Sequence, residues 1–180
     1  MRITGGRYRS RIIDCPPGVI RPSMDRMRQS LFSILGDLSG FSFLDLFSGT
    51  GILGIEAASR GAEPVLLVEK DYRKKATILK NIRFVETAIE LLVAPAERFL
   101  AADRRSWDIV FLDPPFDWPG KEALLDAACA PPHLSPGGVA ILHLHSAEKL
   151  SIARPGLVLV DRREYGQSLL LFFRREASSA

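Results

Sequence analysis

The chain has little cysteine and no long apolar run. Its two cysteines, Cys15 and Cys129, lie far apart and form no CxxC pair, so we expect reduced thiols and no disulfide framework. The longest apolar run near the C-terminus, Leu169–Phe173, is far too short to span a bilayer. The first residues, MRITGGRYR, contain no hydrophobic signal core. These absences predict a cytoplasmic protein that is not bound to a membrane.

Motifs of several large enzyme classes are also absent. The sequence contains no HExxH, GxSxG or GxxxxGK[ST], which argues against a zinc protease, an α/β hydrolase and a P-loop nucleotidase. Its three histidines, His133, His143 and His145, lack further ligands at metal-binding spacing, so we expect no metal site. We interpret His143 and His145, which share one face of an expected strand, as structural, and the lone aromatics Trp118 and Tyr165 as packing residues.

Positive charge is concentrated at the start of the chain. The formal net charge is +3, but residues 1–28 contain seven arginines, no lysine and two acids and carry +5, which leaves −2 on the rest. Arginine binds phosphate bidentately and stacks on bases, so this segment predicts a polyanionic partner, with a solvated basic face as the alternative. The candidate RNA-contacting residues are Arg7, Tyr8, Arg9, Arg11, Arg21, Arg26 and Arg28.

The 180 residues, 47% apolar and 25% charged, fit one compact domain with a short appendage, and we expect a monomer. Residues 1–13 have the pattern of a β-hairpin around Gly5–Gly6. A break at residues 16–18 follows, and Ser23 is a suitable N-cap for a helix whose apolar positions run from Met24 to Leu38. We therefore divide the chain into an arginine-rich hairpin and linker, 1–22, that contacts RNA, and a main domain, 23–180.

From Phe43 onward, short apolar strands alternate with helices. This alternation predicts an α/β fold with a mostly parallel sheet and helices on both faces, and the last two strands, joined at Gly166, predict an antiparallel edge. Ligands in such sheets bind beyond the carboxyl ends of the strands. The expected strands are 43–47, 65–69, 91–94, 108–112, 139–145, 157–164 and 168–173, and the expected helices between them are 52–59, 72–85, 97–101 and 121–130.

A glycine turn follows the first of these strands. Gly49, Gly51 and Gly54 match GxGxxG, a pattern that lets the backbone approach a ligand closely. Glu69 ends the next strand, where a carboxylate can accept hydrogen bonds from both hydroxyls of a ribose. These features are common to sites for NAD and for S-adenosylmethionine.

Asp45, just before the turn, favours S-adenosylmethionine over NAD. A carboxylate there would repel the diphosphate of NAD, which must approach the helix N-terminus. S-adenosylmethionine carries no phosphate but has an ammonium and a sulfonium, which a nearby carboxylate stabilises. A structural acid is the alternative interpretation of Asp45.

The candidate catalytic residues are Asp113, Pro114, Pro115 and Phe116, directly after an apolar strand. The two prolines fix φ and remove two backbone donors, which leaves a stiff turn that presents the Asp113 carboxylate and the Pro114 carbonyl as acceptors. An exocyclic base amine has two N–H donors for such a pair, and acceptors out of the ring plane favour a pyramidal nitrogen whose lone pair can attack a methyl group. Phe116 could stack on the base, which would have to be flipped out of any helix. Prolines that merely end the strand are the alternative.

The carboxylate also bears on the choice of base. Guanine has an N1–H beside its N2 amine, so one carboxylate can accept from both, whereas adenine has an acceptor, N1, beside its amine. Asp113 therefore favours guanine. The preference is mild, since a carboxylate can also accept a hydrogen bond from an adenine amine.

These residues resemble the RsmD-type 16S rRNA guanine-N2 methyltransferases over nearly the whole chain. The turn and the proline motif occur across many methyltransferases, while the arginine-rich opening joined to the Arg-Pro-Ser helix start is specific to the family. The matching segments are RITGGR (2–7), RPSMDR (21–26), LF (31–32), DLFSGTG (45–51) and DPPF (113–116).

The resemblance implies a seven-stranded Rossmann-like sheet with a small N-terminal RNA-contacting hairpin. It implies methyl transfer from S-adenosylmethionine to the N2 of one guanine, guanine(966) in the family, in 16S rRNA of the small ribosomal subunit or an assembly intermediate. Members often have Asp or Asn where this chain has Pro95, so we expect the adenine of the cofactor to be read elsewhere, at the Ala96 backbone. The implied cofactor-binding residues are Asp45, Phe47, Ser48, Gly49, Gly51, Glu69 and Ala96.

Three alternatives stay open. The first is an amino-methyltransferase of another nucleic acid, such as a DNA adenine amine, although 180 residues leave no room for a separate target-recognition domain. The second is an NAD-dependent oxidoreductase, against which Asp45 and the proline turn argue. The third is a catalytically silent RNA-binding protein, which an intact cofactor turn and an intact catalytic turn make a poor fit.

Overall fold

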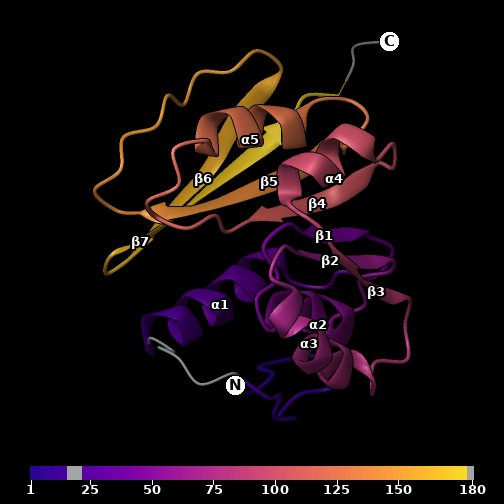
Figure 1. Ribbon diagram of the computed structural model, residues 1–180. Helices are drawn as coiled ribbons and strands as arrows, with labels where there is room; N and C mark the ends of the chain where they lie inside the picture. The colour runs from indigo at the N-terminus through magenta and orange to yellow at the C-terminus, as the bar shows by residue number, and fades with distance from the viewer. Residues whose placement is uncertain (16–21, 178–180) are drawn as a thin grey trace.

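The structure, a computed structural model, describes residues 1–15 and 22–177 and is built on one seven-stranded sheet (Figure 1). The strand order is β3-β2-β1-β4-β5-β7-β6; β1 to β5 are parallel, and β7 is antiparallel between β5 and β6. This confirms the predicted fold class, a Rossmann-like sheet with an antiparallel C-terminal hairpin. The elements in chain order are α1 (Pro22–Leu35), β1 (Phe43–Asp45), α2 (Ile52–Ser59), β2 (Val65–Glu69), η1 (Tyr72–Lys74), α3 (Lys75–Ile82), β3 (Ile89–Val93), α4 (Ala96–Ala102), β4 (Trp107–Leu112), α5 (Lys121–Cys129), β5 (Leu134–His145), β6 (Leu157–Tyr165) and β7 (Ser168–Arg175).

Helices cover both faces of the sheet, with α1, α2 and α3 on one face and α4 and α5 on the other (Figure 1). Alternate residues of each strand point to opposite faces, so the strands feed two buried clusters. In β4, Ile109 and Phe111 belong to the cluster under α1–α3, while Val110 and Leu112 belong to the cluster under α4 and α5. Because both faces are covered, the central strands are apolar at nearly every position.

The site lies beside β1, where the order of the strands in the sheet reverses. The chain leaves β1 for β2 on one side, while β4 pairs with β1 on the other. In such a sheet a crevice opens beyond the carboxyl ends of the two central strands. Asp45 ends β1 and pairs in register with Phe111, two residues before Asp113. The two acids singled out in the sequence therefore meet at one edge.

The first 13 residues double back on themselves, but not as two strands. The Ile3 amide donates to the Arg11 carbonyl at 2.9 Å, and the pair Arg2 and Ile12 forms an isolated antiparallel bridge. Residues 5–10 form bends and turns, so the reversal is much wider than the predicted tight turn at Gly5–Gly6. The limbs of the hairpin are confirmed as antiparallel, and the expectation of regular strands is wrong.

The wide reversal has a physical cause, because residues 1–13, here termed the N-terminal loop, are anchored to α2. Glu56, fully buried in α2, accepts hydrogen bonds from the amides of Thr4 and Gly5 and from the Thr4 hydroxyl. Gly6, with φ +72°, lies so close to α2 that a Cβ would be 1.8 Å from the Ser59 carbonyl oxygen. The loop therefore follows the helix surface instead of pairing with itself throughout.

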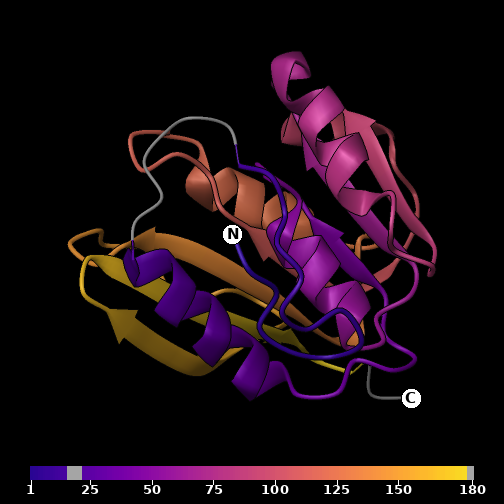
Figure 2. The ribbon, with the colours of Figure 1, turned by 90° about the horizontal axis from the view of Figure 1, so that it is seen from below.

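The N-terminal loop shares its core with the sheet. Ile3, Tyr8 and Ile13 are 1%, 4% and 2% exposed and belong to the same buried cluster as α1 and α2. Figure 2 shows the segment running along α2. The division of the chain at residue 22 stays a prediction, but in the structure the first part has no core separate from the second.

Some expected boundaries differ. Helix α1 ends at Leu35, before the expected Leu38, because Gly36 takes φ +70°. The expected helix 72–85 is a 3₁₀ turn followed by the shorter α3, and β5 begins at Leu134, before the expected start at residue 139. The break at residues 16–18, Arg21 and the side chain of Ser23 lie outside the described residues. Among the described helices, none combines the length and apolarity that crossing a membrane requires.

Candidate active site

The glycine turn between β1 and α2 forms the floor of the site. Gly49 and Gly51 have φ of +57° and +81°, the left-handed region that favours glycine. Gly54 lies in α2, where a Cβ would be 2.2 Å from Cδ2 of Leu67 in β2. Two glycines therefore make the turn, and the third lets α2 pack closely on the sheet.

Asp45 is fully buried beneath this turn. Its Oδ1 accepts a hydrogen bond from the Phe47 amide at 3.3 Å, while its Oδ2 has no partner among the described residues. Burial, together with the negative charges of Asp113 and Glu69, raises the pKa of Asp45 to about 8 against the lowering effect of the Phe47 amide. No cation of residues 1–15 and 22–177 forms an ion pair with this carboxyl, and a bound cation at this position would favour its ionised form.

Glu69, at the end of β2, faces the glycine turn. Its carboxylate accepts hydrogen bonds from the Gly49 amide at 2.9 Å, the Asp71 amide at 2.8 Å and Lys74 Nζ at 3.0 Å. These contacts fix a nearly buried carboxylate at the end of the strand adjacent to β1. Its predicted contact with a ribose stays a prediction that this geometry allows.

Asp113 is held by His143, a contact that the sequence reasoning missed. The Asp113 Oδ1 and the His143 Nδ1 are 2.7 Å apart, so the imidazole can donate to the carboxylate. The histidine is 3% exposed, and its other ring nitrogen, Nε2, has no partner among the described residues. The interpretation of His143 as structural did not foresee this contact with the candidate catalytic carboxylate, and the role of the histidine stays a prediction.

The strand register explains this pair. β4 and β5 are parallel, with Leu112 opposite Leu142, so the next residue of each strand falls side by side at the carboxyl edge. The signal in the sequence was a histidine at the end of the strand after the proline motif. Recognising it requires knowledge that β4 and β5 are neighbours.

Phe116 connects the proline motif to β5. Its ring contacts those of His143 and His145 edge to face, with centroids 5.3 and 5.4 Å apart. Pro114 is buried and Pro115 is exposed, so only the first proline packs into the protein. The two histidines therefore pack against the aromatic residue of the motif.

A partly buried ion pair fixes the far end of this turn. Lys121, at the start of α5, donates through Nζ to the Phe116 carbonyl and to Glu148 Oε2, the latter at 2.6 Å. Glu148 in turn accepts from the His145 amide at 3.1 Å. Lys121 is 5% exposed, so the charge of this lysine holds the proline motif against the loop after β5.

A cavity of about 190 Å³ lies at this edge, between the sheet and the start of the chain. It combines the glycine turn and Asp113 with residues from the first 15 positions and from α1, so the N-terminal segment closes one side of the site. The Ser48 hydroxyl, also buried, has no partner among the described residues. The lining residues are Met1, Cys15, Met27, Arg28, Phe47, Ser48, Gly49, Thr50, Ile52, Leu53 and Asp113.

A small hollow adjoins this cavity, and Phe47 lines both. It contains Ala96, at the start of α4, together with Lys70 and Trp118. The Trp118 and Phe47 rings are 6.1 Å apart. The structure thus places the predicted adenine-reading position next to the cavity, and its role stays a prediction.

Two of the predicted RNA-contacting residues are not at the surface. Tyr8 is 4% exposed, and its hydroxyl accepts from the Glu86 amide, so its prediction as an RNA contact is wrong. Arg28 is 3% exposed and pairs with Asp25 at 3.0 Å, and its predicted contact with RNA stays a prediction. The residues Arg7, Arg9, Arg11 and Arg26 are exposed, and Arg21 lies outside the described residues.

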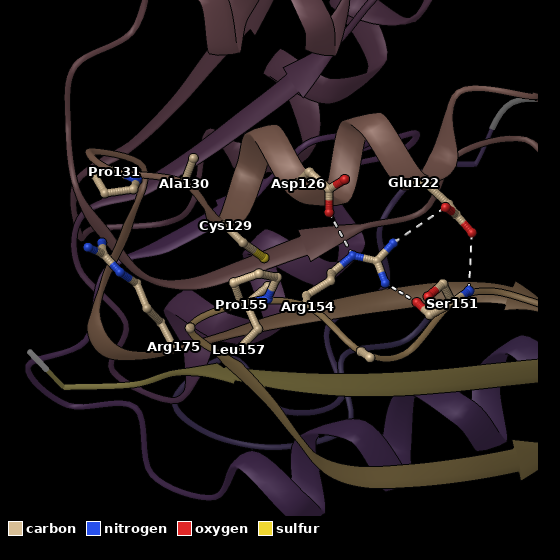
Figure 3. A pocket seen from close by; sticks show the side chains of 12 residues that line it. Glu122, Asp126, Cys129, Ala130, Pro131, Ser151, Arg154, Pro155, Leu157 and Arg175 are labelled. Atoms are coloured by element: carbon tan, nitrogen blue, oxygen red, sulfur yellow. Dashed lines mark hydrogen bonds and ion pairs between the residues drawn. The ribbon is translucent and has the colours of Figure 1, made fainter.

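A second pocket, between α5 and the segment before β6, has polar groups that satisfy one another (Figure 3). Arg154 lies 2.6 Å from Asp126 and 3.9 Å from Glu122, and Glu122 accepts from the Ser151 amide. Burial raises the pKa of Cys129 to about 12, so its thiol stays protonated. We place no active site there.

The residues at the sheet edge fit S-adenosylmethionine better than a phosphate-bearing cofactor. Asp45 Oδ2 and Ser48 Oγ are buried polar atoms without partners among the described residues, and both lie at the turn where the cationic end of the cofactor would bind. A diphosphate would meet three carboxylates, Asp45, Glu69 and Asp113, at the same edge. Within residues 1–15 and 22–177, no three His, Cys, Asp or Glu side chains are grouped to hold a metal ion.

Comparisons with known proteins agree with this site. A family model described as conserved hypothetical protein 95 matches residues 1–174. The chain is 30% identical to "Putative rRNA methyltransferase YlbH" of Bacillus subtilis over 97% of this chain and 99% of that protein. It is 38% identical to ribosomal RNA small subunit methyltransferase D of Escherichia coli over 64% of this chain and 60% of that protein.

The fold agrees over the same length. The solved structure "Putative methyltransferase yhhF from Escherichia coli" superposes with a TM-score of 0.89 at 29% identity and covers 99% of both chains. Because the family match includes the N-terminal loop as well as the sheet, it extends beyond the turn and proline motifs that many methyltransferases share. The chain therefore belongs to the RsmD-type methyltransferase family, and S-adenosylmethionine is the cofactor that its site fits.

Proposed function

We propose that the protein transfers the methyl group of S-adenosylmethionine to the exocyclic N2 of a guanine in 16S rRNA, within the small ribosomal subunit or an assembly intermediate. The observation that carries the proposal is the Asp113 carboxylate, which is oriented by His143 and lines the cavity beside the cofactor turn. Support for the RNA target comes from the two relatives compared above, both of which are rRNA methyltransferases by name.

Asp45 and Glu69 would bind the cofactor. When bound, S-adenosylmethionine supplies a methyl group activated by a positively charged sulfur. The unpartnered Oδ2 of Asp45 would accept a hydrogen bond from the ammonium of its methionine end, and Glu69 would accept from its ribose. Both side chains are nearly or fully buried, so the hydrogen bonds would form where little water competes.

The proline motif would bind the base that is methylated. With Oδ1 held by His143, Asp113 has Oδ2 available to accept an N–H of the guanine, and the Pro114 carbonyl is a second acceptor for the amine. These acceptors would hold the nitrogen with its lone pair directed at the methyl group. After transfer the nitrogen is an ammonium acidic enough to lose its extra proton to water, so Asp113 can act by orientation alone.

The proposal is tested by methyl transfer from methyl-labelled S-adenosylmethionine. Small ribosomal subunits lacking the modification, free 16S rRNA and duplex DNA are offered separately, and the labelled nucleotide is mapped. We expect label in one N2-methylguanosine of 16S rRNA and almost none with the Asp113→Asn variant. Label in adenine, or in DNA in preference to rRNA, would overturn the proposed target.

A further inference from the structure

A pocket rich in arginine lies beside the catalytic cavity, between the N-terminal loop, α1 and α2. It has a volume of about 620 Å³, and four arginines line it together with one acid: Arg2, Arg9, Arg28, Arg60 and Asp25. Figure 2 shows the N-terminal loop and α1 side by side at this position. We refer to it as the arginine pocket.

The inner part of the arginine pocket is built from the buried Arg28 and the partly buried Arg60. Arg28, 3% exposed, donates to the Arg2 carbonyl at 2.9 Å and pairs with Asp25 at 3.0 Å. Arg60 pairs with Glu56 at 3.3 Å, and Glu56 lies 3.8 Å from Arg28. The Nε atoms of Arg28 and Arg60 have no hydrogen-bond acceptor among the described residues. Both Nε atoms are buried, and that of Arg28 faces Glu56, so these two guanidinium groups form the fixed inner wall of the pocket.

The outer part carries charge that no acid of the described residues balances. Arg2 and Arg9 are exposed, and within that part of the chain neither forms an ion pair; the Arg2 guanidinium contacts only the Ser10 carbonyl, at 3.4 Å. Two carboxylates, Asp25 and Glu56, face four arginines, which leaves an excess of two positive charges. Such a concave cluster of guanidinium groups suits an oxyanion that can accept several N–H donors at once.

The position of the arginine pocket indicates which anion this is. Arg28 lines both this pocket and the catalytic cavity that contains Asp113. An anion in the pocket is thus separated by one side chain from a base in the cavity. A base joined to a nearby phosphate is what a nucleotide strand presents. We infer that the arginine pocket binds a backbone phosphate of the RNA substrate, close to the nucleotide that is methylated; this inference rests on the proposed function.

The test removes the two exposed arginines, whose side chains form no ion pair within the described residues. The double variant Arg2→Ala/Arg9→Ala is compared with Arg98→Ala/Arg104→Ala, which removes the same charge from α4 and the loop after it, on the other face of the sheet. A fluorescent single-stranded fragment of 16S rRNA is the probe, titrated at several salt concentrations. Melting temperature and affinity for S-adenosylmethionine serve as checks on folding.

We expect Arg2→Ala/Arg9→Ala to lower the slope of log K against log salt by about 0.7 for each phosphate that the protein no longer binds. The slope should stay near the wild-type value in the control variant Arg98→Ala/Arg104→Ala. The KM for ribosomal particles should rise with kcat and cofactor affinity unchanged. The inference alone would be overturned if the slope fell equally in both variants. It would also be overturned if the slope fell in neither variant while rRNA was still methylated. Wild-type protein that neither binds nor methylates RNA would overturn the proposed function as well.

Discussion

At the scale of single residues, two buried acids differ in how their charge is balanced. Glu56 is surrounded by two arginines and three hydrogen-bond donors of the N-terminal loop. Asp45 has one amide donor and two acids nearby. The protein thus balances the charge of Glu56, which anchors the loop, and provides no cation among the described residues for Asp45 at the cofactor turn.

The raised pKa of Asp45 gives a prediction for cofactor binding. With a pKa of about 8, the free protein holds a proton on Asp45 at pH 7, and an incoming ammonium would favour the carboxylate. Binding of S-adenosylmethionine at pH 7 should therefore release close to one proton. Calorimetry in two buffers of different ionisation enthalpy measures this release, and Asp45→Asn should abolish it and weaken binding by about 1.5–3 kcal/mol.

The same shift has a consequence for stability. The pKa of Asp45 in the folded protein lies above its unfolded value of 3.8. Ionisation of this carboxyl therefore costs more free energy in the folded protein than in the unfolded chain. The free protein should lose stability as the pH rises from about 4 to about 8, and Asp45→Asn should reduce that loss. A wild-type protein that releases no proton on binding the cofactor, and whose pH dependence equals that of Asp45→Asn, would show that Asp45 is already ionised.

The contact between His143 and Asp113 predicts a positioning role. His143→Leu removes the donor to Asp113, while His143→Asn can place an amide N–H where Nδ1 lies. A hydrogen bond to a charged group contributes about 1.5–3 kcal/mol, so His143→Leu should lower kcat by about ten- to a hundredfold without changing cofactor affinity. His143→Asn should recover much of the rate. Equal rates for the two variants would indicate that the contact serves packing only.

At the scale of elements, α2 connects the glycine turn at its start with the N-terminal loop along its length. Its eight residues are all buried, including Glu56. The loop closes the catalytic cavity and contributes two arginines to the arginine pocket. The anchoring of the loop on α2 therefore affects both the catalytic cavity and the arginine pocket.

Loss of that anchor should be costly. Glu56→Ala would leave Arg28 and Arg60 without their buried carboxylate, and we expect the free energy of unfolding to fall by about 3–5 kcal/mol. The control is Glu86→Ala, which breaks an ion pair with Arg7 in which both side chains are more than half exposed, and should cost about 0–1 kcal/mol. Denaturant titration measures both. Similar losses in the two variants would argue against Glu56 as the anchor.

At the scale of the whole molecule, the described part of the basic segment packs into the same core as the sheet. The sequence places +5 on residues 1–28, and the structure distributes those arginines unequally: some stay on the surface, while Arg28 lies between two pockets. Burial of Ile3, Tyr8 and Ile13 fastens the segment to the core. Arg28 is consequently held beside the catalytic cavity, whereas Arg7 and Arg11 lie against Glu86 and Phe84, before β3.

The sheet, the glycine turn and the acids at the strand ends could all be predicted from the residues alone. These features depend on local causes: strand 65–69 and helix 52–59 have the predicted bounds, and Gly49 and Gly51 have the positive φ that a tight turn requires. The family resemblance follows from the same local segments and from the Arg-Pro-Ser helix start.

Which distant residues meet could be learned only from the folded chain. The pairing of His143 with Asp113 depends on the neighbouring positions of β4 and β5, and the burial of Tyr8 and Arg28 depends on where the N-terminal loop packs. Neither strand order nor loop packing leaves a periodic pattern in the residues involved. A histidine at a strand end and an arginine in a basic segment look alike in sequence whether they face solvent or a carboxylate, because burial is set by elements far away in the chain.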